Sequence, residues 1–204
     1  MAIQDTARRT RRQALRRQQV LEAAAAVFAR VGYVSATLEL IGEEVGLSKT
    51  SLYYYVTSKE DLLASLVVTA IEAIETHFAR LRPSDADPRV EFEAFVRAHV
   101  GVACTLTGQV VCQNLDFVFR DQPNQDMVAA RRRHQASLRG ILERGVEQQL
   151  FRAVDVRTVT ALVLAALNTV PLWARSTDDP KRLAREAAQL ALNGLLLPET
   201  ARVP

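Results

Sequence analysis

The chain has 204 residues, of which 49% are hydrophobic and 24% are charged, and its formal net charge is +3. This balance is ordinary for a soluble globular protein of one large or two small domains, and it excludes a general polycation. No apolar run follows the arginine-rich N-terminus and no uninterrupted apolar stretch reaches bilayer length, so we expect a cytoplasmic protein with no membrane partner. Cys104 and Cys112 are expected to be reduced thiols, because their spacing fits neither a redox pair nor a metal motif. A redox role for either cysteine stays open.

Arginine dominates the N-terminal arm. The first 17 residues hold one acidic residue, Asp5, and six arginines: Arg8, Arg9, Arg11, Arg12, Arg16 and Arg17. By itself such a charge run usually marks a solvated, disordered terminus. Beside a nucleic-acid-binding motif it serves as an arm for phosphates or for a narrow minor groove. An Ala-rich amphipathic helix follows through Phe28.

The segment 37–62 has the layout of a helix-turn-helix. Thr37 is a suitable N-cap for a short helix over 37–45, in which apolar residues recur at helical spacing. Gly46 then ends this helix, because a residue without Cβ enters the left-handed cap conformation cheaply. Ser48 is a second N-cap, and it predicts a further helix of about two turns over 49–56.

The second helix has an inward and an outward face. Leu52 and Val56 are spaced to pack inward, and Tyr55 beside them is expected to join that small core. The outward face carries polar and aromatic residues that suit base edges and phosphates: Lys49, Thr50, Ser51, Tyr53 and Tyr54. The sequence therefore predicts double-stranded DNA as the partner. With this motif adjacent, we also favour DNA contact by the arm through Arg8, Arg9, Arg11 and Arg12.

These residues resemble the DNA-binding domain of TetR-type transcriptional repressors. The resemblance covers about the first third of the chain and is carried by Gly32-Tyr33, the Thr-led helix 37–45, the turn Gly46-Leu47-Ser48, the run Leu52-Tyr53-Tyr54-Tyr55 and the closing Ser58-Lys59-Glu60 with Leu62. It implies base contacts from Lys49, Thr50 and Tyr53, and backbone contacts from Thr37, Ser51, Tyr54 and Lys59.

Three positions depart from the family pattern. Gly42 stands where the family usually has Ala, and Val56 where it usually has Phe. A Gly inside a helix costs about 1 kcal/mol relative to Ala, so the fold should survive. Glu39 occupies a position that often contacts DNA. Whether it accepts from a cytosine amine or points to solvent stays open.

The rest of the chain is predicted to be helical, which gives an all-α fold. We expect helices over 60–81, 90–104, 110–120, 126–150, 156–173 and 180–197, the last capped by Asp179, with breaks near 83–88, 121–124 and 176–179. Residues 1–62 are expected to form the arm and a three-helix DNA-binding domain. Residues 63–204 are expected to form a helical effector-binding and dimerisation domain.

The last two helices are the expected homodimer interface. Small and branched apolar residues on them allow close helix packing, although they would equally close a monomer core: Leu162, Ala165, Ala166, Ala187, Ala188, Ala191 and Leu195. A helix-turn-helix protein normally reads two half-sites with a two-fold dimer. The resemblance implies a four-helix interface from these helices, so we favour dimerisation.

A small-molecule effector is expected among the middle helices, where the resemblance implies a cavity whose occupant lowers DNA affinity. Nine apolar residues are candidates for the lining of this pocket, although such residues more commonly fill a core. They are Phe92, Phe95, Val96, Leu115, Phe117, Leu138, Leu142, Leu167 and Trp173. His99 joins them, with a hydrogen-bonded core histidine favoured over an effector contact. Arg131 to Arg133 and the stretch 168–175 look like the subgroup that answers to acyl-coenzyme A thioesters, and a solvated helix face is the alternative for these arginines.

An enzyme is not predicted. The histidines His77, His99 and His134 lack ligand spacing, and the sequence has no Gly-rich phosphate loop or nucleophile motif, so we expect no catalytic residues, metal or cofactor. The predicted function is a ligand-responsive transcriptional regulator, most often a repressor. The alternative is a ligand-independent or architectural DNA-binding protein, which would bind random duplex as tightly as an operator.

Overall fold

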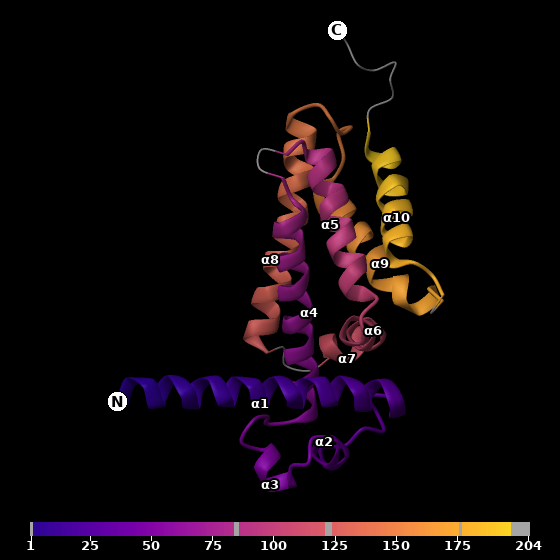
Figure 1. The fold of residues 1–204 in the computed structure, drawn as a ribbon. Coiled ribbons are helices and arrows are strands. Elements are labelled where there is room, and N and C mark those ends of the chain that lie inside the picture. Colours follow the sequence, from indigo (N-terminus) through magenta and orange to yellow (C-terminus); the bar gives the residue numbers. More distant parts are fainter. Residues whose placement is uncertain (1, 84–85, 121–123, 176, 197–204) are drawn as a thin grey trace.

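The computed structural model describes residues 2–83, 86–120, 124–175 and 177–196, and its account of side chains omits residues 2–7, 9 and 118–120. Within these residues the chain is all-α, as predicted, with one isolated bridge between Phe151 and Leu196. The helices are α1 (Ala2–Val31), α2 (Leu38–Glu44), α3 (Lys49–Leu52), α4 (Lys59–Leu81), α5 (Pro88–Ala103), α6 (Leu106–Gln113), α7 (Leu115–Arg120), α8 (Gln125–Glu147), α9 (Val156–Trp173) and α10 (Pro180–Leu195). In Figure 1, α1 lies across the base of a bundle, with α2 and α3 on one side of it and the later helices on the other.

Local capping signals set the boundaries of the helix-turn-helix. Thr37 and Ser48 each accept a hydrogen bond from a backbone N–H in the first turn of the helix that follows, as predicted. Gly46 has a φ of 64°, the left-handed conformation expected at the end of α2. Buried Ile41 and Leu52 pack these two short helices into the core beneath α1.

Helix α3 is shorter than the expected 49–56. It ends at Leu52, and residues 53–55 form a turn. The N–H groups of Tyr54 and Tyr55 bond to carbonyls three residues back, which tightens the end of the helix. Tyr55 is half-buried against the core, in agreement with its expected packing.

Helix α4 joins the two parts of the fold. Ser58 caps its start, and the helix runs to Leu81, so the expected domain boundary between residues 62 and 63 falls inside a continuous helix. It packs against α1 at its first turns and against α5 and α8 beyond them. Figure 1 shows α4 rising from α1 into the centre of the bundle. A single rigid element therefore connects the N-terminal unit to the C-terminal helices.

The C-terminal core lies between α4, α5, α8 and α10. Phe92 and Phe95 on α5 are fully buried, with Phe95 edge-on to Phe78 at 5.6 Å and Phe92 edge-on to Phe151 at 6.4 Å between ring centroids. Helix α10 lies along α5, and Asp179 caps it as predicted. Aromatic side chains thus close this end of the bundle.

The expected single helix over 110–120 is instead two helices, α6 and α7, separated at Asn114. Helix α6 bends by 90° from α5. Gly108 makes this bend possible, because a Cβ there would lie 2.1 Å from the carbonyl oxygen of Val102. The missing side chain lets α6 begin directly against the end of α5.

Two helices, α4 and α9, are long and apolar enough to cross a membrane by length and composition, contrary to our expectation. Most apolar residues of α4 are buried inside the protein. Helix α9 instead leaves apolar residues exposed, among them Leu162 and Trp173. Its outer face has no partner within the described part of this single chain.

Candidate DNA-binding surface and effector cavity

The reading surface is formed by α3 and the turn after it. Lys49 and Thr50 are exposed, and so are Tyr53 at 49% and Tyr54 at 81%. Ser51 is half-buried because its N–H and hydroxyl both contact Ser48. Two adjacent tyrosine rings leave apolar surface in contact with water, and binding of a partner would bury that surface.

Glu39 lies beside this surface and forms an ion pair with Lys49. Their hydrogen bond lowers the pKa of the Glu39 carboxyl and raises that of the Lys49 ammonium. Both side chains are about half exposed, Lys49 at 57% and Glu39 at 49%. In the isolated chain Glu39 therefore does not simply point to solvent. It neutralises a lysine of the reading surface.

Lys59 is the first residue of α4, and its ammonium group is held by the backbone of the same chain. Its Nζ donates to the carbonyl oxygens of Tyr33 at 2.9 Å, Val34 at 3.1 Å and Ala36 at 3.1 Å. It also lies 4.7 Å from the centroid of the Tyr33 ring. An ammonium group has three donors, and here all three are used within the turn that joins α1 to α2. The structure thus assigns Lys59 to this turn rather than to a phosphate.

The N-terminal arm is helical rather than extended. The described side chains before Val20, those of residues 8 and 10–19, are exposed apart from half-buried Arg16, and they include Arg8, Arg11 and Arg12. The side chain of Arg9 lies outside the described residues. The arm projects beyond α2 and α3 in Figure 1. A helix of 30 residues spans about 45 Å, which is longer than one turn of B-DNA.

Two further arginines anchor α1 to the rest of the fold. Arg16 donates to the carbonyl of Val45 at 3.1 Å, and Arg17 donates to the hydroxyl of Ser65 at 2.9 Å. These contacts tie α1 to the end of α2 and to α4. The five arginines of the arm whose side chains are described therefore divide into two that anchor α1, Arg16 and Arg17, and three that lie further from the fold.

A cavity of about 620 Å³ lies among α4, α5, α6, α8 and α9. Most of its wall is apolar, with residues such as Val67, Ile71, Ile74, Val102, Val111 and Leu164. Its polar lining includes His99, His134, Asn168 and Arg131, which we call its polar end. This size and this mixture of an apolar wall with few polar groups are typical of small-molecule sites.

Only part of the expected pocket set lines this cavity, namely His99 and Leu115. Phe92, Phe95, Val96, Leu138, Leu142 and Leu167 are buried in the core, whereas Phe117 and Trp173 are exposed at 40% and 59%. Phe117 instead contacts the Tyr33 ring at 5.1 Å. Most of the expected pocket residues therefore fill the core, as apolar stripes on helices commonly do.

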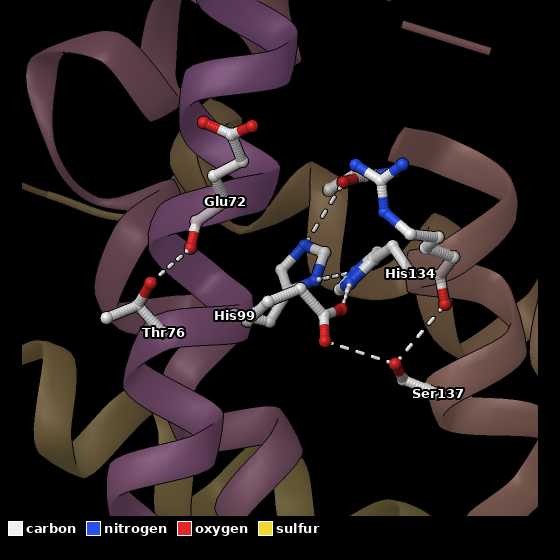
Figure 2. A network of polar contacts seen from close by, with 8 residues as sticks. Glu72, Thr76, His99, His134 and Ser137 are labelled. Atoms are coloured by element: carbon white, nitrogen blue, oxygen red, sulfur yellow. Dashed lines mark hydrogen bonds and ion pairs between the residues drawn. The ribbon is translucent and has the colours of Figure 1, made fainter. Parts of the chain in front are cut away.

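Sequence reasoning missed a chain of four polar side chains, the polar relay, formed by Glu75, His134, His99 and Asn168. His134 Nδ1 lies 2.9 Å from Glu75 Oε1, His99 Nδ1 lies 3.1 Å from His134 Nε2, and His99 Nε2 lies 3.1 Å from Asn168 Oδ1. Ser137 donates to the other oxygen of Glu75 at 3.1 Å. Figure 2 shows the two imidazoles facing each other between their helices. The relay crosses α4, α8, α5 and α9 in that order.

Burial sets the protonation of the relay. It lowers the pKa of His99 to about 3, assisted by the charge on His134, so His99 is neutral at pH 7. Burial raises the pKa of Glu75, but the hydrogen bond and charge of His134 outweigh it, and the pKa is lowered. Glu75 is therefore a carboxylate. His99 is a satisfied buried histidine, as favoured, and it is also part of the cavity wall.

The two thiols are near this cavity, and Cys112 lines it. Burial raises the pKa of Cys112 to about 11 and also raises that of Cys104. A thiolate is the reactive form of cysteine, so both are poor nucleophiles at neutral pH.

The expected interface residues fall into two groups. Leu162, Ala165 and Ala166 lie on the exposed face of α9, together with Leu172 and Trp173. On α10, Ala187 and Ala191 are half-buried, and Ala188 and Leu195 are buried in the core at 1% and 4% exposure, because α10 packs along α5. Ala188 and Leu195 are thus corrected to core residues of the single chain. The outer face of α10 presents Leu190, which is 79% exposed.

Comparison with known proteins identifies the family. Residues 20–66 match the family model described as bacterial regulatory proteins, tetR family, and residues 85–195 match the one described as tetracyclin repressor-like, C-terminal domain. The chain belongs to the TetR family. Members of this family are DNA-binding transcriptional regulators, which confirms the predicted class and the prediction that the protein is not an enzyme.

Several TetR-family proteins are similar along most of the chain. PfmR from Thermus thermophilus has a solved structure that is 30% identical, with a TM-score of 0.72, and the match covers 86% of this chain and 97% of PfmR. The transcriptional repressor KstR2 of Mycobacterium tuberculosis is 27% identical over 146 residues, 67% of this chain and 70% of KstR2. The structure of KstR2, a ketosteroid transcriptional regulator of Mycobacterium tuberculosis, has a TM-score of 0.74 at 20% identity over 90% of this chain and 96% of that chain. The repressor NicS of Pseudomonas putida is 27% identical over 154 residues, 74% of this chain and 73% of NicS.

TetR-family regulators bind DNA operators and small-molecule effectors and act as dimers. They are soluble DNA-binding proteins, so the apolar character of α4 and α9 is not evidence of membrane insertion.

Proposed function

We propose that this protein is a cytoplasmic, dimeric transcriptional repressor that leaves its operator when a small apolar effector occupies the cavity. The observation that carries the proposal is that the continuous helix α4 begins just after the exposed reading surface and then lines a cavity of about 620 Å³ with Val67 to Ile74. Family membership supports the regulatory class. Effector binding lowers operator affinity only by the difference between its affinities for the DNA-bound and released states.

The assignment of DNA contacts follows the exposed positions. Lys49, Thr50 and Tyr53 are proposed to reach bases, because they lie at the N-terminal end of α3 and in the turn after it. Thr37, Ser51 and Tyr54 are proposed to meet phosphates, as are Arg8, Arg11 and Arg12 of the helical arm and Arg9 with them. Lys59 is omitted from this set, since its donors are already used.

The dimer interface is proposed on the outer faces of α9 and α10. Leu162, Ala165 and Ala166 form an apolar stripe on α9 at helical spacing, and Leu190 is a further exposed apolar residue, on α10. An exposed apolar stripe of this kind marks a protein interface. A two-fold axis through this face would place two copies of α3 for two operator half-sites.

An acyl-coenzyme A thioester is the proposed effector. The apolar wall of the cavity suits an acyl chain, and Arg131 in its lining suits a coenzyme phosphate. Arg132 and Arg133 line a separate hollow on α8 and are not part of this cavity. KstR2, titled a ketosteroid regulator, supports an effector with a large apolar body.

Fluorescence-anisotropy titration tests this function. Duplex from the intergenic region beside the gene and random duplex are titrated at fixed salt, with and without octanoyl-coenzyme A and steroid-derived coenzyme A thioesters. We expect the intergenic duplex to bind at least ~10³-fold tighter than random duplex, and a thioester to release it. Equal affinity for both duplexes would favour the architectural alternative. Specific binding that no thioester changes would remove the acyl-coenzyme A assignment and keep the regulator.

A further inference from the structure

The effector cavity is open to solvent along α9. Residues that α4 and α5 contribute to its lining are all buried, from Val67 on α4 to Ala103 on α5. Helix α9 contributes six residues, and only Leu164 and Asn168 among them are buried or half-buried. The four exposed residues form the α9 rim, which consists of Ala161, Ala165, Thr169 and Leu172. The cavity wall is therefore complete at α4 and α5 and incomplete at α9.

The exposed part of the lining differs between helices. On α6, α7 and α8 it is polar and consists of Gln113, Asp116 and Gln135, which suit contact with water. On α9 it is mostly apolar, and its one hydroxyl, that of Thr169, donates to the Ala166 carbonyl at 2.8 Å. Apolar surface gains free energy when it is removed from water. The α9 rim thus has the chemistry of a wall against which another apolar surface packs.

The outer face of α9 carries no charge. No Asp, Glu, Lys or Arg lies between Arg157 and Arg175, although a helix on a protein surface normally has a charged or polar face. Leu162 is 65% exposed and Trp173 is 59% exposed on this helix. An uncharged apolar face is complementary to itself across a two-fold axis. Because TetR-family proteins act as dimers, a second copy of this chain is the partner that fits it.

The α9 rim and the proposed interface stripe overlap on the helix. Residues three and four positions apart share a helix face, and neighbouring residues are about 100° apart around the axis. Ala165 belongs both to the rim, with Ala161 and Thr169, and to the stripe, with Leu162 and Ala166. A chain that packs on the stripe therefore also lies over part of the rim.

We propose, on the basis of the dimer interface proposed above, that a second copy of this chain covers the α9 rim and supplies the missing apolar wall of the cavity. The cavity is then complete only in the dimer. A ligand that reaches the rim touches both copies, so its binding free energy depends on how the copies are arranged. The rim is thus the place where cavity occupancy acts on the spacing of the two α3 helices.

Access of a thiol reagent to Cys112 tests the missing wall without any ligand or DNA. Cys112 lines the cavity, and Cys104→Ser leaves it as the single thiol of the chain. Labelling by N-ethylmaleimide at one fixed pH is followed by intact-protein mass spectrometry. Addition of Leu162→Glu, which should separate the copies, is expected to increase the labelling rate at least about tenfold, because the reagent then enters past the uncovered rim.

Val90→Glu in the same Cys104→Ser chain is the matched control. It places the same charge on an exposed apolar residue of α5 outside the cavity lining, so the protein should remain dimeric and label at an unchanged rate. A monomeric Leu162→Glu protein with unchanged labelling would overturn the missing wall and keep the proposed interface. A Leu162→Glu protein that stays dimeric would overturn both. Operator binding by the unsubstituted protein, titrated separately, reports on the regulatory function alone.

Cross-linking tests the covered rim even if Leu162→Glu does not fold. Ala165→Cys, in a chain that also carries Cys104→Ser and Cys112→Ser, should be joined to a second copy by a short bismaleimide and run as a covalent dimer on a denaturing gel. Val90→Cys in the same chain should stay monomeric on that gel. Absence of the Ala165→Cys dimer at concentrations where the protein is dimeric would overturn the proposal. Recovery of the uncross-linked protein with phosphatidylcholine vesicles would assign the face to a membrane and overturn it equally.

Discussion

Replacement of Lys59 by Met separates a structural role from a DNA-binding one. The methionine keeps the length and the apolar stem of the side chain and removes three donors at 2.9, 3.1 and 3.1 Å from carbonyl oxygens. The bonds to Tyr33 and Ala36 are only part-buried, so each is expected to contribute about 1–1.5 kcal/mol. The Val34 carbonyl is in an exposed segment where water replaces the donor, so the combined loss is roughly 2–3 kcal/mol. For a chain of this size the melting temperature should fall by about 4–12 °C.

The assay combines thermal unfolding with operator titration at several salt concentrations, all at one protein concentration because the family acts as dimers. Below the melting temperature, Lys59→Met should bind the operator within about twofold of the unsubstituted protein, with an unchanged dependence of affinity on salt. Lys181→Met, an exposed lysine in the first turn of α10, is the control for loss of one positive charge. The opposite result would be an unchanged melting temperature and a slope of log affinity against log salt that is smaller by about 1. It would refute the reasoning and show that Lys59 contacts a DNA phosphate.

Three further predictions concern the reading surface, the dimer and the relay. Glu39→Gln should release Lys49 and strengthen operator binding by roughly three- to tenfold in a titration at about 0.1 M salt, whereas weaker binding would indicate a base contact by Glu39. Leu162→Glu should give a folded monomer in analytical ultracentrifugation, whereas Ala188→Glu should unfold the chain itself, and a dimeric Leu162→Glu would remove α9 from the interface. His99 has a folded pKa of about 3 and an ordinary value of 6.5, so the unfolded state binds more protons between these values and stability should fall as pH decreases from 6.5, by up to about 1.4 kcal/mol per pH unit. Urea titrations at pH 7, 6, 5 and 4 check this, and an equal fall in His99→Phe would assign the effect to other groups.

Features that depend on neighbouring residues were predictable from the sequence. The caps at Thr37, Ser48 and Asp179 and the left-handed Gly46 are properties of four or five consecutive residues, so the sequence pattern locates them directly. The exposure of Tyr54 was also expected, because helical spacing separates it from Leu52 and the core.

Features that depend on distant residues were not predictable in the same way. Lys59 reaches carbonyls 23 to 26 positions earlier in the chain, and nothing next to it indicates that its donors are used. Helix α6 begins at Leu106, earlier than the expected 110, and only its packing against the carbonyl of Val102 shows why Gly108 is needed there. Ala188 belongs to a helix with small residues on two faces, and only the position of α5 decides which face is buried.

The polar relay is the strongest case of this difference, because its four members come from four helices and no two are closer than 24 positions in the sequence. His99 and His134 are too far apart in the sequence to form a local metal-binding motif, so the spacing gave no sign that they meet. Their contact arises because α5 and α8 pack together, which brings each ring within 6.3 Å of Phe95 between centroids. The apolar packing of α5 against α8 also removes water from the two imidazoles. A hydrogen bond from a ligand to this pair would therefore be stronger than the same bond at the protein surface.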